Sequence, residues 1–148
     1  MHVLFVTDFS PIVTDPDVSR QFYINGLELP LTGEPPRSEQ LEGVKHFGLW
    51  PLSEAARACF GTDTWPSHLR IPQANLEFEV ADVAAAASEL EAKGLALLHP
   101  ARVEPWGQTI ARLLSPDGLI IGICWTPWLH SVGDEKGAAD APGLSSSA

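Results

Sequence analysis

Two stretches of the chain share one pattern, and this internal repeat constrains the fold more than any other feature. The segment GVKHFGLW at 43–50 parallels GLIIGICW at 118–125, with Gly first and Trp last in both. Upstream, residues 10–29 and 75–97 follow one order: a strand pattern, an Asp, a helical pattern, then Gly-Leu and a second short strand. Because these features recur in the same order, we predict two βαβββ modules in tandem.

The second copy ends a predicted β-hairpin. Residues 108–114 and 119–125 have strand composition, and the sequence SPDG separates them. Pro sets φ at the first corner of such a turn, and Asp-Gly supplies a residue that tolerates positive φ. Ile-rich composition with two Gly residues disfavours a helix for the second segment.

The start of the second module shows the clearest period-two alternation in the chain. In NLEFEV, residues 75–80, the apolar side chains fall on one face. We predict that this face packs on the next helix, which Asp82 caps and Gly94 ends. The opposite face carries Asn75, Glu77 and Glu79.

The first module is predicted from weaker signals. Its helix is expected to have Asp17 as N-cap and to bury Val18 and Phe22, which lie one turn apart. Residues 27–32 are predicted to return as a short strand. After the first Trp, Ser53 is expected to cap a short Ala-rich helix.

These patterns indicate one domain over residues 1–130. The first module spans about 9–51, a linker covers 52–72, and the second module spans about 73–129. Residues 131–148 contain Gly, Ala, Ser and acidic residues without periodicity, so we predict a disordered tail.

Composition excludes several classes of protein. The net charge is −10, from 19 acidic and 9 basic residues, which argues against a nucleic-acid partner and is compatible with a cationic ligand. No apolar run approaches the ~20 residues that span a bilayer, and the N-terminus lacks the basic region of a signal peptide. Cys59 and Cys124 lie in apolar contexts, which predicts reduced, buried thiols and a cytoplasmic location.

Three motifs carry a resemblance to a known superfamily. They are DPDVSRQFYINGLEL at 15–29, NLEFEVADVAAAASELEAKG at 75–94 and PWGQTIARLLSPDGLIIGI at 105–123. In this order they resemble the glyoxalase, bleomycin-resistance and extradiol-dioxygenase superfamily, also called vicinal oxygen chelate proteins. The resemblance covers about residues 10–129. It implies an α+β fold in which two βαβββ modules form a curled mixed-sheet cup with helices outside, and a homodimer.

The resemblance also implies four metal-ligand positions in the cup. They fall near Ser10, Phe47, Asn75 and Gly122, and none of these is a carboxylate or His. Because Zn, Ni or Fe needs His, Glu or Cys donors, we expect no cofactor and assign the chain to a metal-free branch. A register slip of one residue at Phe47 places His46 in the cup instead, so a divalent metal held by displaced ligands is the alternative.

Strand parity points Glu77 and Glu79 into the cup, with Arg112 of the hairpin as a candidate partner. Three roles are open for these carboxylates. They form a structural pair with the Arg, they anchor a ligand cation or amide, or one of them is a general base with a raised pKa.

Aromatic side chains are the other ligand candidates. Trp50 and Trp125 occupy matching strand ends, and Trp106 precedes the hairpin, with Gln108 beside it as a donor to a ligand carbonyl. These Trp residues suit stacking on a planar or cationic compound, and the alternative is contact within the core or a dimer.

Our first functional hypothesis is a metal-free small-molecule-binding protein of the bleomycin-resistance type, which sequesters a planar or cationic compound. The alternative is an enzyme of the same superfamily: a lyase, isomerase or dioxygenase with displaced metal ligands or a Glu general base. A third reading is a regulatory module with a vestigial cup. The sequence leaves open whether the protein is an enzyme.

Overall fold

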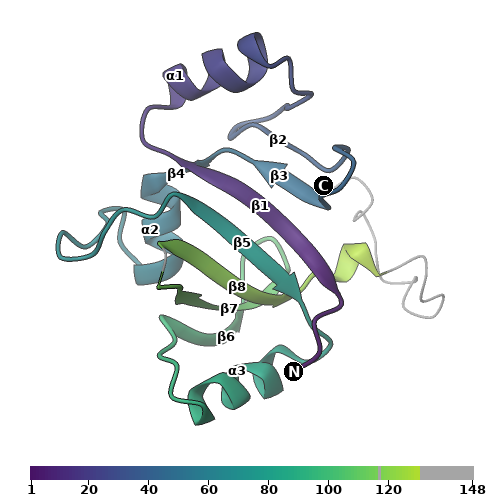
Figure 1. Ribbon diagram of the computed structural model, residues 1–148, viewed down its shortest axis with the longest axis vertical. Coiled ribbons are helices and arrows are strands. Elements are labelled where there is room, and N and C mark those ends of the chain that lie inside the picture. The colour runs from purple at the N-terminus through teal and green to yellow at the C-terminus, as the bar shows by residue number, and fades with distance from the viewer. Residues whose placement is uncertain (117, 131–148) are drawn as a thin grey trace.

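The strand-forming segments of both modules pair into one curled mixed sheet (Figure 1). The computed structural model describes residues 1–116 and 118–130; Asp117 of the predicted turn and the predicted tail at 131–148 lie outside the described residues. Within the described part, no helix is long and apolar enough to cross a membrane. In chain order the elements are β1 (Phe5–Val13), α1 (Pro16–Arg20), the π-helix η1 (Gln21–Gly26), β2 (Arg37–Ser38), β3 (His46–Gly48), β4 (Trp50–Pro51), α2 (Leu52–Phe60), β5 (Ala74–Glu79), α3 (Val83–Ala92), β6 (His99–Val103), β7 (Thr109–Leu114), β8 (Leu119–Trp125) and the 3₁₀-helix η2 (Pro127–Leu129).

The sheet confirms the predicted α+β fold of two βαβββ modules. Its strand order is β2-β3-β1-β5-β8-β7-β6, and β4 also pairs with β1. The first strands of the two modules, β1 and β5, pair antiparallel. The strands of the repeated Gly-to-Trp segments lie parallel to the first strand of their own module: β3 and β4 beside β1, and β8 beside β5. The two halves of the sheet are therefore built alike.

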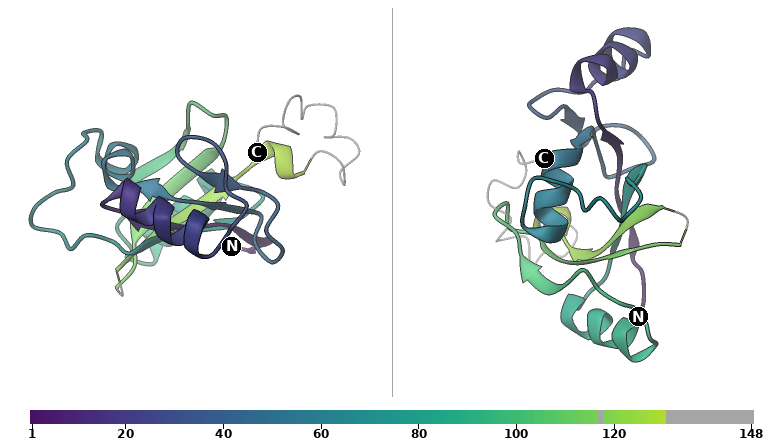
Figure 2. Two further views of the ribbon diagram at one scale, coloured as in Figure 1. Left: turned by 90° about the horizontal axis from the view of Figure 1, so that it is seen from above. Right: turned by 90° about the vertical axis from the view of Figure 1, so that its left-hand side faces the viewer.

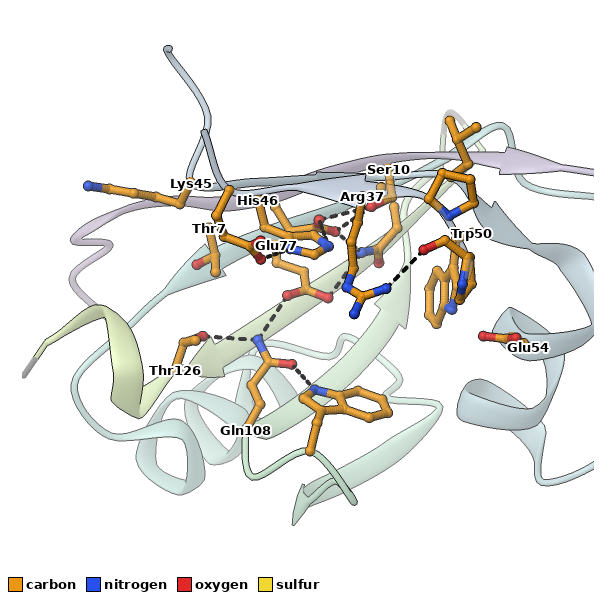
Figure 3. A pocket seen from close by; sticks show the side chains of 18 of the residues that line it. Thr7, Ser10, Arg37, Lys45, His46, Trp50, Glu54, Glu77, Gln108 and Thr126 are labelled. Carbon is orange, nitrogen blue, oxygen red and sulfur yellow. Dashed lines mark hydrogen bonds and ion pairs between the residues drawn. The ribbon is translucent and has the colours of Figure 1, made fainter. Parts of the chain in front are cut away.

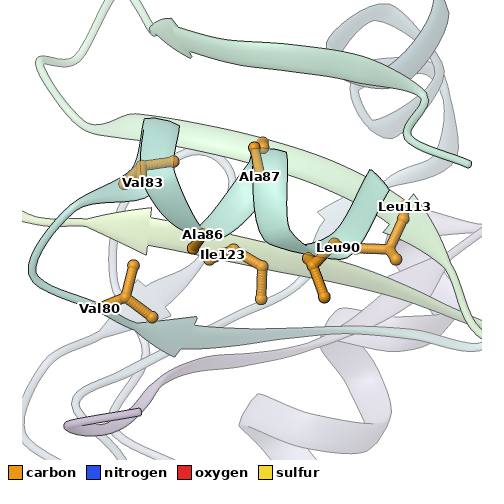
Figure 4. Packing of buried hydrophobic residues seen from close by; sticks show 8 residues of the cluster. Val80, Val83, Ala86, Ala87, Leu90, Leu113 and Ile123 are labelled. Carbon is orange, nitrogen blue, oxygen red and sulfur yellow. The ribbon is translucent and has the colours of Figure 1, made fainter. Parts of the chain in front are cut away.

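Helix α3 covers the outer face of the second module (Figure 4). Asp82 caps it as predicted, because its carboxylate accepts a hydrogen bond of 3.0 Å from the backbone N–H of Ala85. The apolar stripe of the helix packs on one face of β5, β7 and β8, in a buried cluster of Val80, Val83, Ala86, Ala87, Leu90, Ala111, Leu113 and Ile123. Since side chains alternate along a strand, Glu77, Arg112 and Gly122 belong to the opposite, inner face.

Helix α2 covers one end of the inner face. Its Ala55, Ala56 and Cys59 pack around Ile120 of β8. The helix begins directly after Pro51, which takes the N-cap position, so the prediction of a Ser53 cap is wrong. Both cysteines are buried free thiols, as predicted. The rest of the inner face is left for a cavity.

The first helix differs from its prediction in start and burial. Asp15 caps it, accepting from the N–H of Val18 at 3.2 Å, and Pro16 follows at the first helical position. The predicted burial of Val18 and Phe22 is wrong, since they are 63% and 57% exposed. The helix lies at the far end of the molecule from α3, beyond the curved sheet (Figures 1 and 2), which explains this exposure.

The strand predicted at 27–32 does not form. Glu28 has a φ of 57°, and Pro30 has no N–H to donate to a ladder. Only Thr32 pairs, in an isolated bridge with Arg37. The chain here packs on the first module through Leu31, which joins Val13 and Leu49 in a small buried cluster.

Candidate functional site

A cavity of about 510 Å³ lies on the inner face of the sheet (Figure 3). Both modules line it: β1, β3 and β4 in the first module, and β5, β7 and the segment after β8 that includes η2 in the second. Its floor is polar, three Trp side chains (Trp50, Trp106 and Trp128) contribute to its walls, and the loop at 34–37 forms part of its rim.

The floor contains two buried carboxyl groups, those of Asp8 and Glu77. The amide nitrogen of Asn75 bridges them, donating to Asp8 Oδ2 at 2.6 Å and to Glu77 Oε2 at 3.0 Å. The Ser10 hydroxyl also donates to Asp8, at 2.9 Å to Oδ1. The hydrogen-bond donors that hold these carboxyl groups are therefore neutral.

A β-bulge brings Asp8 to the floor. The register between β1 and β5 shifts between Val6 and Asp8, so Thr7 is an extra residue in the ladder. Thr7 and Asp8 are consecutive, yet both line the cavity. A regular strand alternates its faces and cannot point two consecutive residues the same way.

Burial makes the Asp8 carboxyl an unusually weak acid. Loss of water around the carboxyl is the largest cause and the nearby charge of Glu77 adds to it, while the charge of His46 and the hydrogen bonds from Ser10 and Asn75 act in the opposite direction. Together they raise the pKa of Asp8 to about 8. The group therefore carries a proton at neutral pH.

His46 of β3 lines the cavity. Its Nε2 lies 3.7 Å from Asp8 Oδ1, and its Nδ1 contacts Glu39. Burial disfavours the charged ring, but the hydrogen bond to Glu39 and the surrounding carboxylates outweigh burial and raise the pKa of His46 above its ordinary value. The slipped register considered above is the one that the structure adopts, and Phe47 points to the other face, against Tyr23.

Glu77 enters the cavity because residue 122 is Gly. The two residues are direct neighbours on β5 and β8. A β-carbon at position 122 would lie 2.9 Å from Glu77 Cγ and 2.8 Å from Ile110 Cδ1, closer than real contacts allow. Gln108 then holds Glu77 Oε1 through its Nε2 at 3.0 Å. The position that the resemblance assigns to a metal-binding carboxylate is thus filled from the neighbouring strand.

The resident side chains do not fit the metal that the superfamily implies. Of the four positions assigned by resemblance, Ser10 and Asn75 line the cavity, Phe47 faces away and Gly122 has no side chain. In the described part of the chain, no three His, Cys, Asp or Glu side chains are grouped so that they could hold a metal ion. The amide of Asn75 donates to both floor carboxyls, where a cation needs acceptors.

The aromatic wall is held by the same polar network. Trp106 is half exposed and donates from its indole N–H to Gln108 Oε1 at 3.0 Å. On the α2 side, Trp50 lies 5.7 Å from the guanidinium of Arg112. Arg112 is fully buried and pairs with Glu104 at 2.5 Å, so neither Glu77 nor Glu79 is its partner. Trp50, Trp106, Gln108 and Arg112 all line the cavity.

Two of the residues proposed from sequence lie outside the cavity lining. Glu79 is fully buried at the end of β5, where it accepts from Thr7 at 2.7 Å and contacts His130 at 2.7 Å. The turn between β8 and η2 covers the Glu79 side chain and fixes its position. Trp125 lies on the α3 side of β8 and stacks on His130, with ring centroids 3.6 Å apart.

Sequence reasoning did not single out Asp8, although a signal for it exists. Asp8 precedes the cap Asp15 by seven residues, and Asn75 precedes the cap Asp82 by the same seven residues. Aligning the two modules on their helix caps therefore places Asp8 in the position equivalent to Asn75. Glu39 and Lys45 lie in irregular segments and Arg37 lies in the two-residue strand β2, so none of the three has such a signal.

Comparison with known proteins agrees with this architecture. The methylmalonyl-CoA epimerase of Streptomyces coelicolor, solved with 2-nitronate-propionyl-CoA, aligns with a TM-score of 0.52 at 16% identity, over 84% of this chain and 98% of that one. The epimerase of Mycobacterium tuberculosis aligns at 0.53 and 16% identity, over 83% and 88%. A glyoxalase/bleomycin resistance protein/dioxygenase superfamily member from Vibrio splendidus 12B01 aligns at 0.51 and 17%, over 81% and 97%. At these identities the likeness shows the fold alone.

Sequence comparison places the chain more directly. No curated protein matches it significantly. A family profile described as a glyoxalase-like domain matches residues 6–126, which is most of the chain and includes both modules. The chain therefore belongs to the glyoxalase-like domain family.

Proposed function

We propose that this protein binds and sequesters a planar, cationic small molecule in the cavity between its two modules. The observation that supports this proposal is the buried pair of carboxyl groups on the floor, Asp8 and Glu77, whose hydrogen-bond donors are the neutral groups of Ser10, Asn75 and Gln108. Neutral donors satisfy hydrogen bonds but do not offset charge, and His46, 3.7 Å from Asp8, offsets it only in part, since the pKa of Asp8 stays raised. A ligand cation offsets it, and burial strengthens that attraction.

The walls suit the planar part of such a ligand. Trp50, Trp106 and Trp128 line the cavity and present aromatic faces or edges to its contents. An aromatic contact with a cation contributes ~0.5–2 kcal/mol, depending on desolvation. The net charge of −10 favours the approach of a cation from solution. Sequestration needs affinity only, so the vacant metal positions do not prevent it.

Benzamidine, benzamide and benzoate test the proposal, because they have similar shapes and carry charges of +1, 0 and −1. We expect benzamidine to bind most tightly, benzamide about tenfold or more weakly and benzoate not measurably, by calorimetry and Trp fluorescence. Trp106→Phe removes a cavity fluorophore and should reduce the ligand-dependent signal, whereas Trp65→Phe, in the buried cluster beside α2, should not. Equal affinity for benzoate would contradict a cation site.

Acid–base catalysis is the second candidate, and the raised pKa of Asp8 favours it. A protonated Asp8 beside the Glu77 carboxylate could return a proton to a carbon from which Glu77 removes one, next to a carbonyl group. The superfamily neighbours include methylmalonyl-CoA epimerases. NMR in D₂O tests this: exchange at C2 of methylmalonyl-CoA that is lost in Glu77→Gln supports catalysis, and absence of exchange favours binding alone.

We also propose that the protein is a homodimer. Phe9 on β1, Val18 on α1 and Phe22 on η1 leave apolar side chains exposed, at 40%, 63% and 57% of their surface. Exposed apolar groups on one side of a molecule are typical of a contact surface. Light scattering should give twice the chain mass of 16.0 kDa, and Phe22→Asp should give the monomer. Val103→Asp, on an exposed β6 side chain, should leave the dimer intact; a monomeric wild type would contradict the proposal.

We propose that the protein is cytoplasmic. Cys59 and Cys124 are buried and unpaired, which is usual for a reducing compartment. A protein that sequesters a toxic cation is useful where that compound reaches its target. Fractionation of the native host, with the protein detected by antibody, tests the location.

A further inference from the structure

One buried acceptor on the cavity floor has no partner. Asn75 is 1% exposed, and its Oδ1 makes no hydrogen bond within the described residues, while its Nδ2 serves both Asp8 and Glu77. Leaving a buried carbonyl oxygen unsatisfied is unfavourable, so such atoms are few in native proteins and each calls for a specific explanation, such as a functional role or a bound water or ion. The oxygen belongs to a side chain that lines the cavity.

The surrounding groups are also acceptors. Asp8 Oδ2 and Glu77 Oε2 both bond to the same Asn75 nitrogen, so the three side chains lie together. Two separate backbone features bring the carboxyls there: the bulge at Thr7 in the first module and the missing side chain of Gly122 in the second. The floor therefore offers two carboxyl groups that share the Asn75 amide nitrogen as a donor, and the carbonyl oxygen of the same amide is a third acceptor beside them.

We propose that Asp8, Asn75 and Glu77 form a subsite for the primary ammonium group of the ligand. This inference rests on the proposed function and narrows it. A primary ammonium has three N–H donors and one positive charge, which matches three acceptor groups with two carboxyls among them. It replaces the Asn75 amide as the common donor, so that side chain is free to rotate and turn Oδ1 toward the ammonium as its partner. A quaternary ammonium has the charge without the donors. Among the described residues, no three His, Cys, Asp or Glu side chains are grouped so that they could hold a metal ion.

Three compounds with one phenyl ring separate these properties in the wild-type protein: benzylamine, benzyl alcohol and benzyltrimethylammonium. We expect calorimetry at pH 7 to show benzylamine binding at least about tenfold more tightly than either of the others. If benzyltrimethylammonium binds as well as benzylamine, the Trp faces recognise the charge; the ammonium subsite is then wrong and the proposed cation-binding function stands. If benzyl alcohol binds equally well, charge is unimportant and both proposals fail.

A pair of variants locates the site. Glu77→Gln keeps the shape of the side chain and removes its charge, and we expect it to weaken benzylamine about tenfold or more while changing benzyl alcohol little. Glu91→Gln removes the same charge from the exposed surface of α3 and should leave both affinities within about twofold. Circular dichroism verifies that each variant folds. Equal weakening of both compounds by Glu77→Gln would overturn the assignment.

A measurement of metal binding by the wild-type protein tests whether the floor is a metal site instead. Stripped protein should show no stoichiometric uptake of Zn²⁺, Ni²⁺, Fe²⁺ or Mn²⁺ by elemental analysis. Tight uptake of one ion per chain, lost in Glu77→Gln, would show that the floor is a metal site and would overturn the ammonium subsite.

Discussion

Replacing Arg112 with Met is expected to reduce the free energy of unfolding by about 3–5 kcal/mol, because it leaves Glu104 as a buried carboxylate without its main partner. Arg112 is fully buried and Glu104 is 7% exposed. Among the described residues, the other Arg that contacts Glu104 is Arg102, whose contact is longer, at 3.4 Å, and whose side chain is 41% exposed. Arg112 also donates to the carbonyl of Ala58 at 3.3 Å, so its loss loosens α2 from the sheet.

Urea unfolding measures this prediction, and two further variants control it. Arg57→Met, on α2, removes an exposed Arg whose nearest carboxylate is 3.9 Å away, and should cost less than about 1 kcal/mol. Arg112→Met combined with Glu104→Gln should recover part of the loss, since neither charge is then left unpaired. A single-variant loss no larger than that of Arg57→Met would show that the buried pair does not hold α2.

The second large effect concerns pH. The Asp8 carboxyl has a pKa of about 8 in the folded protein and an ordinary value of 3.8. Between these pH values the folded state keeps a proton that the unfolded state has lost, so the free energy of unfolding falls as pH rises, and the full loss is reached above about pH 8. Glu77 and His46 are the charged groups that face Asp8; burial and Glu77 raise its pKa, and His46 lowers it.

Asp8→Asn removes this titration and keeps a side chain of the same shape. We expect the variant to become more stable than the wild type as pH rises, by roughly 3–6 kcal/mol at pH 9, with little difference near pH 4. Urea unfolding between pH 4 and 9 gives the two curves, and Asp63→Asn, an exposed loop residue, should run parallel to the wild type. Parallel curves for Asp8→Asn would mean that Asp8 is ionised in the native cavity.

Binding of a cationic ligand is expected to release the proton that the Asp8 carboxyl holds. A cation next to Asp8 favours its ionised form, so a bound cation lowers the pKa of Asp8 and releases its proton. Calorimetry with benzylamine in buffers of different ionisation enthalpy counts that proton. Release of a proton that disappears in Asp8→Asn identifies its source.

The sequence by itself determined the modular fold, because its signals are local. Period-two alternation in NLEFEV, the capping Asp82 and the spacing of the repeated Gly-to-Trp segments depend on a few consecutive residues, and the structure bears them out. Parity also predicted that Glu77 faces inward. It could not predict that Glu79, on the same face, is covered by the turn into η2, since that contact joins distant segments.

Only the tertiary structure decided the composition of the site. The bulge that turns Asp8 inward arises from the pairing of β1 with β5, and the register that places His46 in the cavity arises from the pairing of β1 with β3. Glu104, rather than Glu77, meets Arg112 because β6 and β7 lie side by side. A one-residue shift of a strand moves each of its side chains to the opposite face of the sheet. The residues of that strand alone do not determine which of the two pairings forms. The composition of the cavity therefore depends on the pairing and register of the strands, whereas the modular fold depends on the local sequence of each strand and helix.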